Sequence, residues 1–310
     1  MIDLLDPKND VVFKAILVPE CNEDVLISLI TAVTKPPKKI VSAKVQNPEL
    51  PKKKVTDKGV ILDILARLDD GSYTHIEMQM NWKTLLSERS HYYAAKLFSS
   101  QLQRGVNYSK LKPTTSIYLL NDIAFEDGPP NTFHYTFRMK EDKSLALLSS
   151  FMIMHFIEIP KLFGKIRNEP GDGRNLPLED WCLFLYNPSD PALQKEVFSR
   201  MPALKKAHET LKEVSTKEEL RELARMREKA RLDHESFVDA AYMEGEAKGR
   251  AEGEAKGRAE GRNEAELETK KKILCSLIAD PVTKHFDVEK LAILTQLSVS
   301  EVQELLKSIS

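Results

Sequence analysis

Two neighbouring runs of alternating apolar and polar residues, at 59–68 and 73–80, constrain the fold most strongly. They read GVILDILARL and YTHIEMQM, and both have the two-residue period of half-buried strands. Asp69-Asp70-Gly71 separates them, and three-residue loops with a glycine in the left-handed conformation commonly join antiparallel strands. The sequence therefore predicts a β-hairpin.

The hairpin brings two carboxylates together. A three-residue loop pairs Leu68 with Ser72, and the same register pairs Asp63 with Glu77. Opposed side chains lie about 5 Å apart at Cβ, and two carboxylates that close repel each other unless a cation lies between them. A solvated polar strand face is the alternative, but the four apolar residues flanking Asp63 make a lone carboxylate costly to bury there. We therefore expect a shared metal at Asp63 and Glu77.

A predicted helix at 84–105 carries a second polar cluster. Arg89, Tyr93 and Lys96 recur at helical spacing along one face, where they could contact phosphate oxygens. The alternative is that Tyr93 belongs to the core and that Arg89 pairs with Glu77. The sequence leaves both interpretations open.

The order of predicted elements indicates an α/β fold. A helical region at 10–33, divided by Pro19, comes first and is followed by three strands, a helix and a fourth strand. The strands are expected at 38–47, 59–68, 73–82 and 114–122, with two more at 131–138 and 153–159.

The second half of the chain is almost entirely helix-forming. We expect an α/β domain at 1–190, a helical extension at 191–240, a glycine-repeat helix or linker at 241–272, and a small helical hairpin at 273–310. The repeat contains EGEAKGRA twice, with glycine at every fourth residue. Such a stripe allows close helix packing in a homodimer, whereas a solvated linker is the alternative.

Composition limits the partners. Lys and Arg total 46 against 47 Asp and Glu, so the net charge is −1 and any contact with DNA requires a local basic surface. The three cysteines are scattered, and no apolar run approaches a membrane span. We therefore expect an intracellular, cytoplasmic protein without a membrane partner.

Three sequence segments together resemble the PD-(D/E)XK nuclease family transposases, also called Rpn-type recombination-promoting nucleases. They are the run DxxFKxIL at 10–17, the LDI and HIEMQ strands, and RSHYYAAKLFSSQLQRGVNYSKLKPTTSIYLLN at 89–121. The resemblance covers roughly residues 5–190, and the glycine-rich helix with its short helical tail is also similar to that family.

The resemblance implies a restriction-endonuclease-like core, αβββαβ, with a mixed sheet flanked by helices. It also implies Mg²⁺-dependent (or Mn²⁺-dependent) hydrolysis of DNA phosphodiesters and a role in promoting recombination. Asp63 corresponds to the first metal-binding Asp, and Glu77 to the acidic residue of the (D/E)XK element. Gln79 lies where the general fold has Lys.

Glutamine can hydrogen-bond a water molecule but supplies no positive charge. We expect Gln79 to position water, a backbone carbonyl near Met78 to add a metal ligand, and Asp10 to act as an accessory acid. Strand parity favours Lys83 over Lys58 as a substitute cation, and the helix residues Arg89 and Lys96 are further alternatives.

Two rival hypotheses remain. The first is a nuclease-fold protein that binds DNA or another partner without efficient cleavage, which the glutamine at position 79 would favour. The second is a transposase of the three-acid integrase type, which requires a third carboxylate on a later helix. No residue after 120 stands out for that role, so we rank it last.

Overall fold

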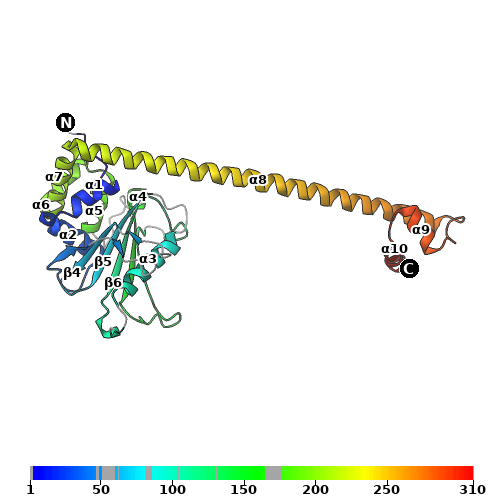
Figure 1. The fold of residues 1–310 in the computed structure, drawn as a ribbon, viewed down its shortest axis with the longest axis horizontal. Coiled ribbons are helices and arrows are strands. Elements are labelled where there is room, and N and C mark those ends of the chain that lie inside the picture. The colour runs from blue at the N-terminus through cyan, green and yellow to red at the C-terminus, as the bar shows by residue number, and fades with distance from the viewer. Residues whose placement is uncertain are drawn as a thin grey trace. The chain divides into compact units, whose positions relative to one another are not determined.

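A mixed six-stranded sheet, in the order β1-β4-β5-β6-β8-β7, is the centre of the first part of the molecule (Figure 1). The structure is a computed structural model and describes residues 3–46, 49–50, 60–61, 63–80, 86–102, 105, 107–129, 132–164 and 176–309. Chain contacts divide it into two units, Met1–Arg231 and Leu232–Ser310. The strands of this sheet are β1 (Ala43–Val45), β4 (Ile64–Leu68), β5 (Tyr73–Gln79), β6 (Thr114–Leu120), β7 (His134–Arg138) and β8 (Met152–Glu158).

The parallel strands β5, β6 and β8 form the middle of the sheet, and the remaining strand pairs are antiparallel. Two short strands, β2 (Glu49–Leu50) and β3 (Val60–Ile61), pair separately. The helices and helical turns of this unit are α1 (Asp10–Leu17), η1 (Glu20–Asn22), α2 (Glu23–Thr34), α3 (Leu86–Ser100), η2 (Tyr108–Lys110), α4 (Ile159–Gly164), α5 (Leu176–Tyr186), η4 (Leu193–Val197), α6 (Phe198–Arg200), α7 (Pro202–Thr216) and the first part of α8 (Glu218–Ala279). The predicted order αβββαβ is therefore confirmed.

Local chemistry explains the first two helices. The Asn9 side chain accepts a hydrogen bond from the Val11 N–H and caps α1, and α1 ends at Leu17, before Pro19. Helix α2 ends because Lys35 adopts a left-handed conformation (φ 46°) and two prolines follow it. The predicted division of this helical region at Pro19 is confirmed.

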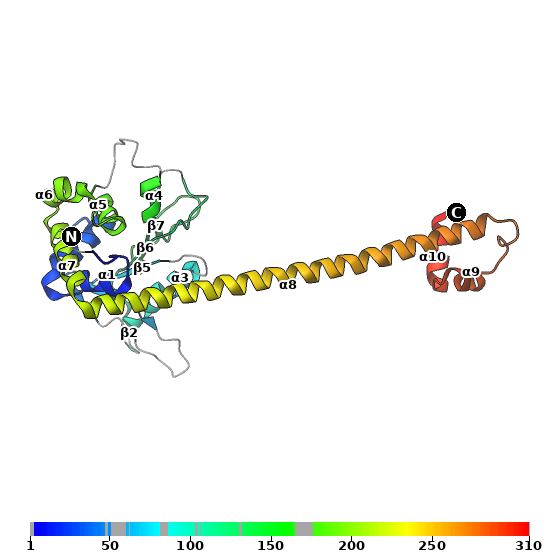
Figure 2. The same ribbon diagram turned by 90° about the horizontal axis from the view of Figure 1, so that it is seen from above.

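The two faces of the sheet have different cover. Ile64, Ile76 and Ile117 face the main core, which α1, α2, α5 and α7 complete. Alternate residues face the other way, where Leu65 packs with Leu97 of α3. Figures 1 and 2 show α3 on the other side of β5 and β6 from α1 and α2. Glu77 alternates along β5 with Ile76 and Met78, which face the main core, so its side chain belongs to the α3 side.

One predicted strand is wrong in its extent. Residues 59–68 were expected to form one strand, but β3 ends at Ile61, Asp63 lies in a bend, and β4 begins at Ile64. The bend accompanies two contacts that a regular strand residue would not make, because the Asp63 carboxylate accepts a hydrogen bond from the Met78 N–H and pairs with Lys14. The run GDGRNLP at 171–177, whose glycines and proline predict a loop, lies largely outside the described residues.

The main core also includes residues beyond 190. Leu204, Leu211 and Val214 of α7 belong to the same buried cluster as Val12 of α1 and Leu26 of α2. The four-part division expected from the sequence stays a prediction. The structure adds that α7 contributes to the core formed by the N-terminal helices.

The second unit contains the rest of α8, with α9 (Val288–Thr295) and α10 (Val299–Ile309). Leu274, Leu291 and Val302 form the centre of its own small core, and Figure 2 shows α9 and α10 beside the last turns of α8. Gln296 links the two short helices in a left-handed conformation (φ 55°). Ser298 lies between these two helices, directly before α10.

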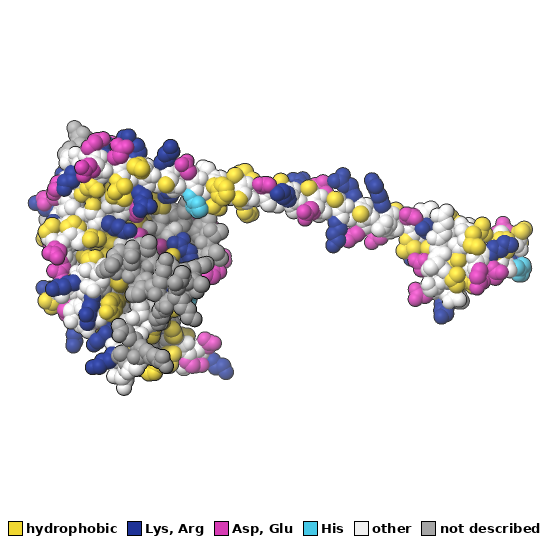
Figure 3. All heavy atoms as spheres, viewed as in Figure 1, with side chains coloured by type: hydrophobic (Ala, Val, Ile, Leu, Met, Phe, Trp, Pro, Cys, Tyr) yellow, Lys and Arg dark blue, Asp and Glu magenta, His cyan; other side chains and the backbone are white. Residues whose placement is uncertain are grey.

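The glycine repeat is helical throughout. Lys248 pairs with Glu244 (2.6 Å) and Lys256 with Glu260 (3.8 Å). Both pairs have the i,i+4 spacing that supports a helix. Figure 3 shows basic and acidic side chains interleaved along α8. Among the described helices, none is both long enough and apolar enough to cross a bilayer.

Candidate metal and nuclease site

The β4–β5 hairpin has the predicted register. Ile64 pairs with Ile76 and Leu65 with His75, and Leu68 N–H donates to Ser72 O (2.9 Å). Gly71 adopts the left-handed conformation (φ 83°) that the three-residue loop requires. Continuing this register by one residue places Asp63 opposite Glu77.

The hydrogen-bond pattern adds a detail. Leu68 and Ser72 are hydrogen-bonded partners, so pairs an odd number of residues away, such as Asp63 with Glu77, are of the non-hydrogen-bonded kind. Side chains approach more closely in such pairs, with about 4.5 Å between Cα atoms. The backbone therefore favours two adjoining carboxylates.

Asp63 is held from two sides. Its Oδ1 lies 3.0 Å from Lys14 Nζ on α1, and its Oδ2 accepts a hydrogen bond from the Met78 N–H (3.3 Å). The N–H and C=O of one strand residue point toward the same edge, so the Met78 carbonyl also faces the Asp63 side of β5. The Gln79 carbonyl, one residue on, accepts from Asn121 N–H on the opposite side, which agrees with this alternation.

Glu77 is nearly buried, with 8% of its surface exposed. Its Oε1 lies 3.6 Å from the Arg89 guanidinium of α3. Burial and then the charge of Asp63 raise the pKa of Glu77 from 4.5 to about 7, although Arg89 and Lys14 oppose this effect. Burial and the neighbouring Asp63 charge therefore both disfavour the ionised form of Glu77.

A buried aromatic and imidazole layer lies behind Glu77. His75 is fully buried, and its Nε2 lies 3.7 Å from Glu77 Oε2. Burial lowers the pKa of His75 to about 3, so the ring is neutral at pH 7 and this contact is no ion pair. The ring meets Tyr118 edge to face, with 5.7 Å between centroids. Within the described part of the chain, neither nitrogen of His75 has a hydrogen-bond partner.

The α3 residues have separate environments. The Arg89 guanidinium lies 5.7 Å from the centre of the Tyr93 ring, which packs beside Leu65 in a small apolar cluster. Tyr93 is therefore partly a core residue and Arg89 lies against Glu77, while a DNA-contact role for these residues stays a prediction. Lys96 is half-buried on the same helix.

The structure places Asp10 in a contact of its own. It pairs with Arg227 (3.6 Å), and the α1 residue beside Asp63 is Lys14, one turn later. The accessory role of Asp10 stays a prediction. Lys58 and Lys83, weighed as substitute cations, lie outside the described residues. Lys14 was not singled out from the sequence, although it is the lysine of the DxxFKxIL run.

The described residues suit a metal held by few protein ligands. No group of three or more His, Cys, Asp or Glu that could hold a metal occurs among them. Mg²⁺ does not require three such protein ligands, because it is commonly bound by one or two carboxylates with water and substrate phosphate. Asp63, Glu77 and the Met78 carbonyl are hard oxygen donors of this kind, and they could hold such an ion.

A third acid on the same face is already engaged. Glu158 is fully buried at the end of β8, and its Oε1 accepts hydrogen bonds from the backbone N–H groups of Ala124 and Phe125 (2.6 and 2.8 Å). Its Oε2 lies 3.1 Å from Lys161. This carboxylate holds a loop in place, so it does not supply the third acid of an integrase-type centre.

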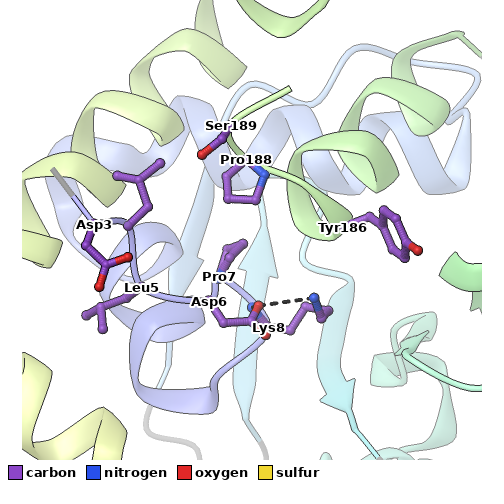
Figure 4. Close-up of a pocket in the computed structure, with 9 residues that line it drawn as sticks. Asp3, Leu5, Asp6, Pro7, Lys8, Tyr186, Pro188 and Ser189 are labelled. Atoms are coloured by element: carbon purple, nitrogen blue, oxygen red, sulfur yellow. Dashed lines mark hydrogen bonds and ion pairs between the residues drawn. The ribbon is translucent and has the colours of Figure 1, made fainter. Parts of the chain in front are cut away.

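The cavity drawn in Figure 4 does not belong to this site. It has a volume of about 540 Å³ and is formed by the N-terminal segment and the end of α5, with Lys8 paired to Asp6 (3.2 Å). None of its lining residues comes from β4, β5 or α3. The carboxylate pair instead lies at the end of the sheet, between α1 and α3.

Comparison with known proteins agrees with this geometry. The family model described as PD-(D/E)XK nuclease family transposase matches residues 7–241. No curated protein and no solved structure matches the chain. The match covers more than half of the chain and includes the helix of Lys14, the hairpin and α3, and the mixed sheet flanked by helices agrees with it. The chain therefore belongs to the PD-(D/E)XK nuclease family transposases.

Proposed function

We propose that this protein is a metal-dependent DNA endonuclease that hydrolyses phosphodiester bonds at the Asp63–Glu77 pair. The observation that carries the proposal is the opposed carboxylate pair, with its raised pKa at Glu77, inside a nuclease-family fold. Membership of the family supports DNA as the substrate and a divalent ion as the cofactor.

Asp63, Glu77 and the Met78 carbonyl would hold Mg²⁺ or Mn²⁺. When bound, the ion would lower the pKa of a water molecule and offset negative charge on the phosphate. Gln79, two residues after Glu77 on the same face, would orient the attacking water through its amide.

The positive charge that the general fold takes from lysine would come from Lys14. Its ammonium group lies against Asp63, and we expect it to turn to the scissile phosphate when a metal occupies the carboxylates. Arg89, Tyr93 and Lys96 on α3 would contact phosphates beside the cleaved bond.

The wider role follows from the family. We propose that cleavage promotes recombination, and that the protein acts in the cytoplasm, since its three cysteines are free in the described chain and suit a reducing compartment.

We further propose a homodimer formed through the glycine-repeat helix. A Cβ added at Gly245, Gly249 or Gly253 would meet no atom within 4 Å, so this face of α8 is open to a partner helix. A chain ending near residue 235 should be monomeric and nick DNA without coordinated double-strand cutting. Light scattering tests this, because a full-length protein that stays monomeric at high concentration would contradict the dimer.

The test of the activity is plasmid cleavage with Mg²⁺ or Mn²⁺. The wild type should nick or linearise the plasmid, and Asp63→Ala and Glu77→Ala should each be inactive yet folded. Asp127→Asn, which alters an exposed acid in the 126–128 turn, is the matched control and should cleave normally. Full activity in either site variant would refute the assignment.

A second function has one observation in its favour. Asp63 and Glu77 are already neutralised in part by Lys14 and Arg89, and position 79 lacks the usual cation. A protein of this kind could bind DNA or another partner with little cleavage. Wild-type protein that binds DNA in a gel-shift assay but leaves plasmid intact with both metals would favour this alternative.

A further inference from the structure

A second cavity lies on the face of the sheet opposite Glu77. It has a volume of about 500 Å³, and Thr74, Thr115 and His155 contribute to its floor. Thr74 pairs with Thr115 across β5 and β6, and it alternates along β5 with His75 and Glu77, which face α3. The last residue of α2 and the segment after it, residues 34–40, also line the cavity. The cavity is therefore separate from the candidate nuclease site.

Positive charge surrounds this cavity. Four cations line it, and in the described part of the chain none of them takes part in an ion pair. They are Lys35, Lys38, Lys39 and Arg138, and we call the space the lysine-rimmed cavity. Four unneutralised cations around one space favour an anionic ligand.

Two acids also line the cavity, but their oxygens are engaged locally. Asp69 Oδ1 accepts hydrogen bonds from the backbone N–H groups of Val41 and Ser42 (3.0 and 3.3 Å). Asp70 Oδ1 accepts from the backbone and the hydroxyl of Ser72 (2.8 and 2.6 Å). Four cations against two acids leave the lining with a net positive charge.

A pair of neutral histidines lies beneath these charges. His155 is 3% exposed and lines the cavity, and its Nδ1 lies 2.9 Å from His134 Nε2. Burial is the main reason that the pKa of His134 is lowered to about 4 and that of His155 to about 3. The charge of Lys35 lowers the pKa of His134 further, and the charge of Arg138 lowers that of His155. The floor therefore offers hydrogen-bonding groups within a positive field.

The remaining lining is largely apolar. Ile30, Ile40, Leu68 and Ile153 contribute hydrocarbon surface next to the cations. Cavities of about 300–1,000 Å³ with apolar walls and a few polar groups are typical of small-molecule sites. Bare inorganic anions would leave these apolar walls without contacts.

We propose that the lysine-rimmed cavity binds a small phosphorylated molecule, with its phosphate at the four cations and its less polar part against the apolar wall. Lysine and arginine bind phosphate through charge-assisted hydrogen bonds. The site requires neither Asp63 nor Glu77, so it is independent of the proposed nuclease activity.

Calorimetric titration of metal-free protein with adenosine 5′-monophosphate tests this. One molecule should bind per chain, and inorganic phosphate and adenosine should each bind more weakly than the nucleotide. The double variant Lys38→Glu with Lys39→Glu, and the single variant Arg138→Glu, should each weaken binding about tenfold or more. Lys195→Glu, an exposed charge reversal outside the cavity, should bind as the wild type does.

Two further measurements keep the result specific. Binding must persist in Asp63→Ala, because its loss there would locate the nucleotide at the nuclease site and overturn the proposal. The side-chain nitrogen resonances of His134 and His155 should shift on titration, and circular dichroism should show that each variant is folded.

Other outcomes also decide the matter. Absence of nucleotide binding, or equal binding by the charge-reversed variants, would overturn the proposal. The protein could also bind a short DNA duplex but no nucleotide, and lose affinity for the duplex in the same variants. That result would assign the cations to a nucleic-acid backbone and would overturn the proposal as well.

Discussion

Replacing Glu77 with glutamine should stabilise the metal-free protein at neutral and alkaline pH. Burial and the charge of Asp63 raise the pKa of Glu77 from 4.5 to about 7. The folded state therefore holds a proton that the unfolded chain releases at lower pH. Glu77→Gln keeps the size of the side chain and removes the ionisation, so it removes this cost.

The sign and size follow from proton linkage. Below about pH 4.5 the carboxyl is protonated in both states and contributes no pH dependence. As pH rises from about 4.5 to about 7, the unfolded state loses its proton first and the free energy of unfolding falls. The difference between the two pKa values corresponds to about 3 kcal/mol at pH 8. This figure is an upper bound, because glutamine also weakens the contact with Arg89.

Urea unfolding in a metal chelator measures this effect. Glu77→Gln should exceed the wild type by up to about 3 kcal/mol at pH 8 and match it near pH 4.5. Glu126→Gln, an exposed glutamate in the 126–128 turn, is the control and should show no such pH-dependent gain. Adding Mg²⁺ at pH 8 should then stabilise the wild type alone, since a ligand that binds the folded state raises its stability.

Two results would refute the reasoning. If the variant is no more stable than the wild type at pH 8, ionisation of Glu77 does not destabilise the folded protein. If the variant gains the same free energy of unfolding at both pH values, the gain comes from packing and not from the carboxylate charge.

Other substitutions test separate contacts. Lys14→Met should slow plasmid cleavage about tenfold or more, because it removes the cation beside the candidate metal site, and Lys14→Arg should recover part of the rate. A normal cleavage rate in Lys14→Met would exclude a catalytic role for this cation. Gln79→Ala should lower the cleavage rate and Gln79→Lys should retain or raise it, and a fast alanine variant would show that water is held elsewhere. Glu158→Gln should lower the free energy of unfolding by about 2 kcal/mol in urea titrations, because it removes the charge of a buried carboxylate that pairs with Lys161. Gly253→Ala should favour the helix by about 1 kcal/mol and raise the helicity seen by circular dichroism. The same variant should weaken the proposed dimer in light scattering, and unchanged association would place the dimer contact elsewhere.

The hairpin and its register were predictable because they depend on neighbours in the sequence. Alternation over two short runs sets which side chains share a face, and a three-residue loop ending at Gly71 sets the pairing. These local rules reach Asp63 and Glu77, which the continued register places opposite each other. They did not predict the bend at Asp63, which comes with contacts to Lys14 and Met78.

The environment of the carboxylates was not predictable in the same way. Lys14 is 49 positions before Asp63 in the chain, and only the packing of α1 against the sheet brings its ammonium group within 3.0 Å of that carboxylate. The burial of Glu77, and with it the pKa of about 7, depends on α3 covering that face. Desolvation is a property of the assembled layers and has no signature in a run of residues.

The sequence by itself therefore determined the strands, their faces, the hairpin register and the family of this protein, because periodicity, turn chemistry and motif are local. Only the tertiary structure decided which cations neutralise the two acids and that lysines after α2 line a cavity on the opposite face. It also decided that His75 is buried, with no hydrogen-bond partner for its ring among the described residues. Charge pairing and burial act through space between segments far apart in the chain, so they follow from the fold as a whole.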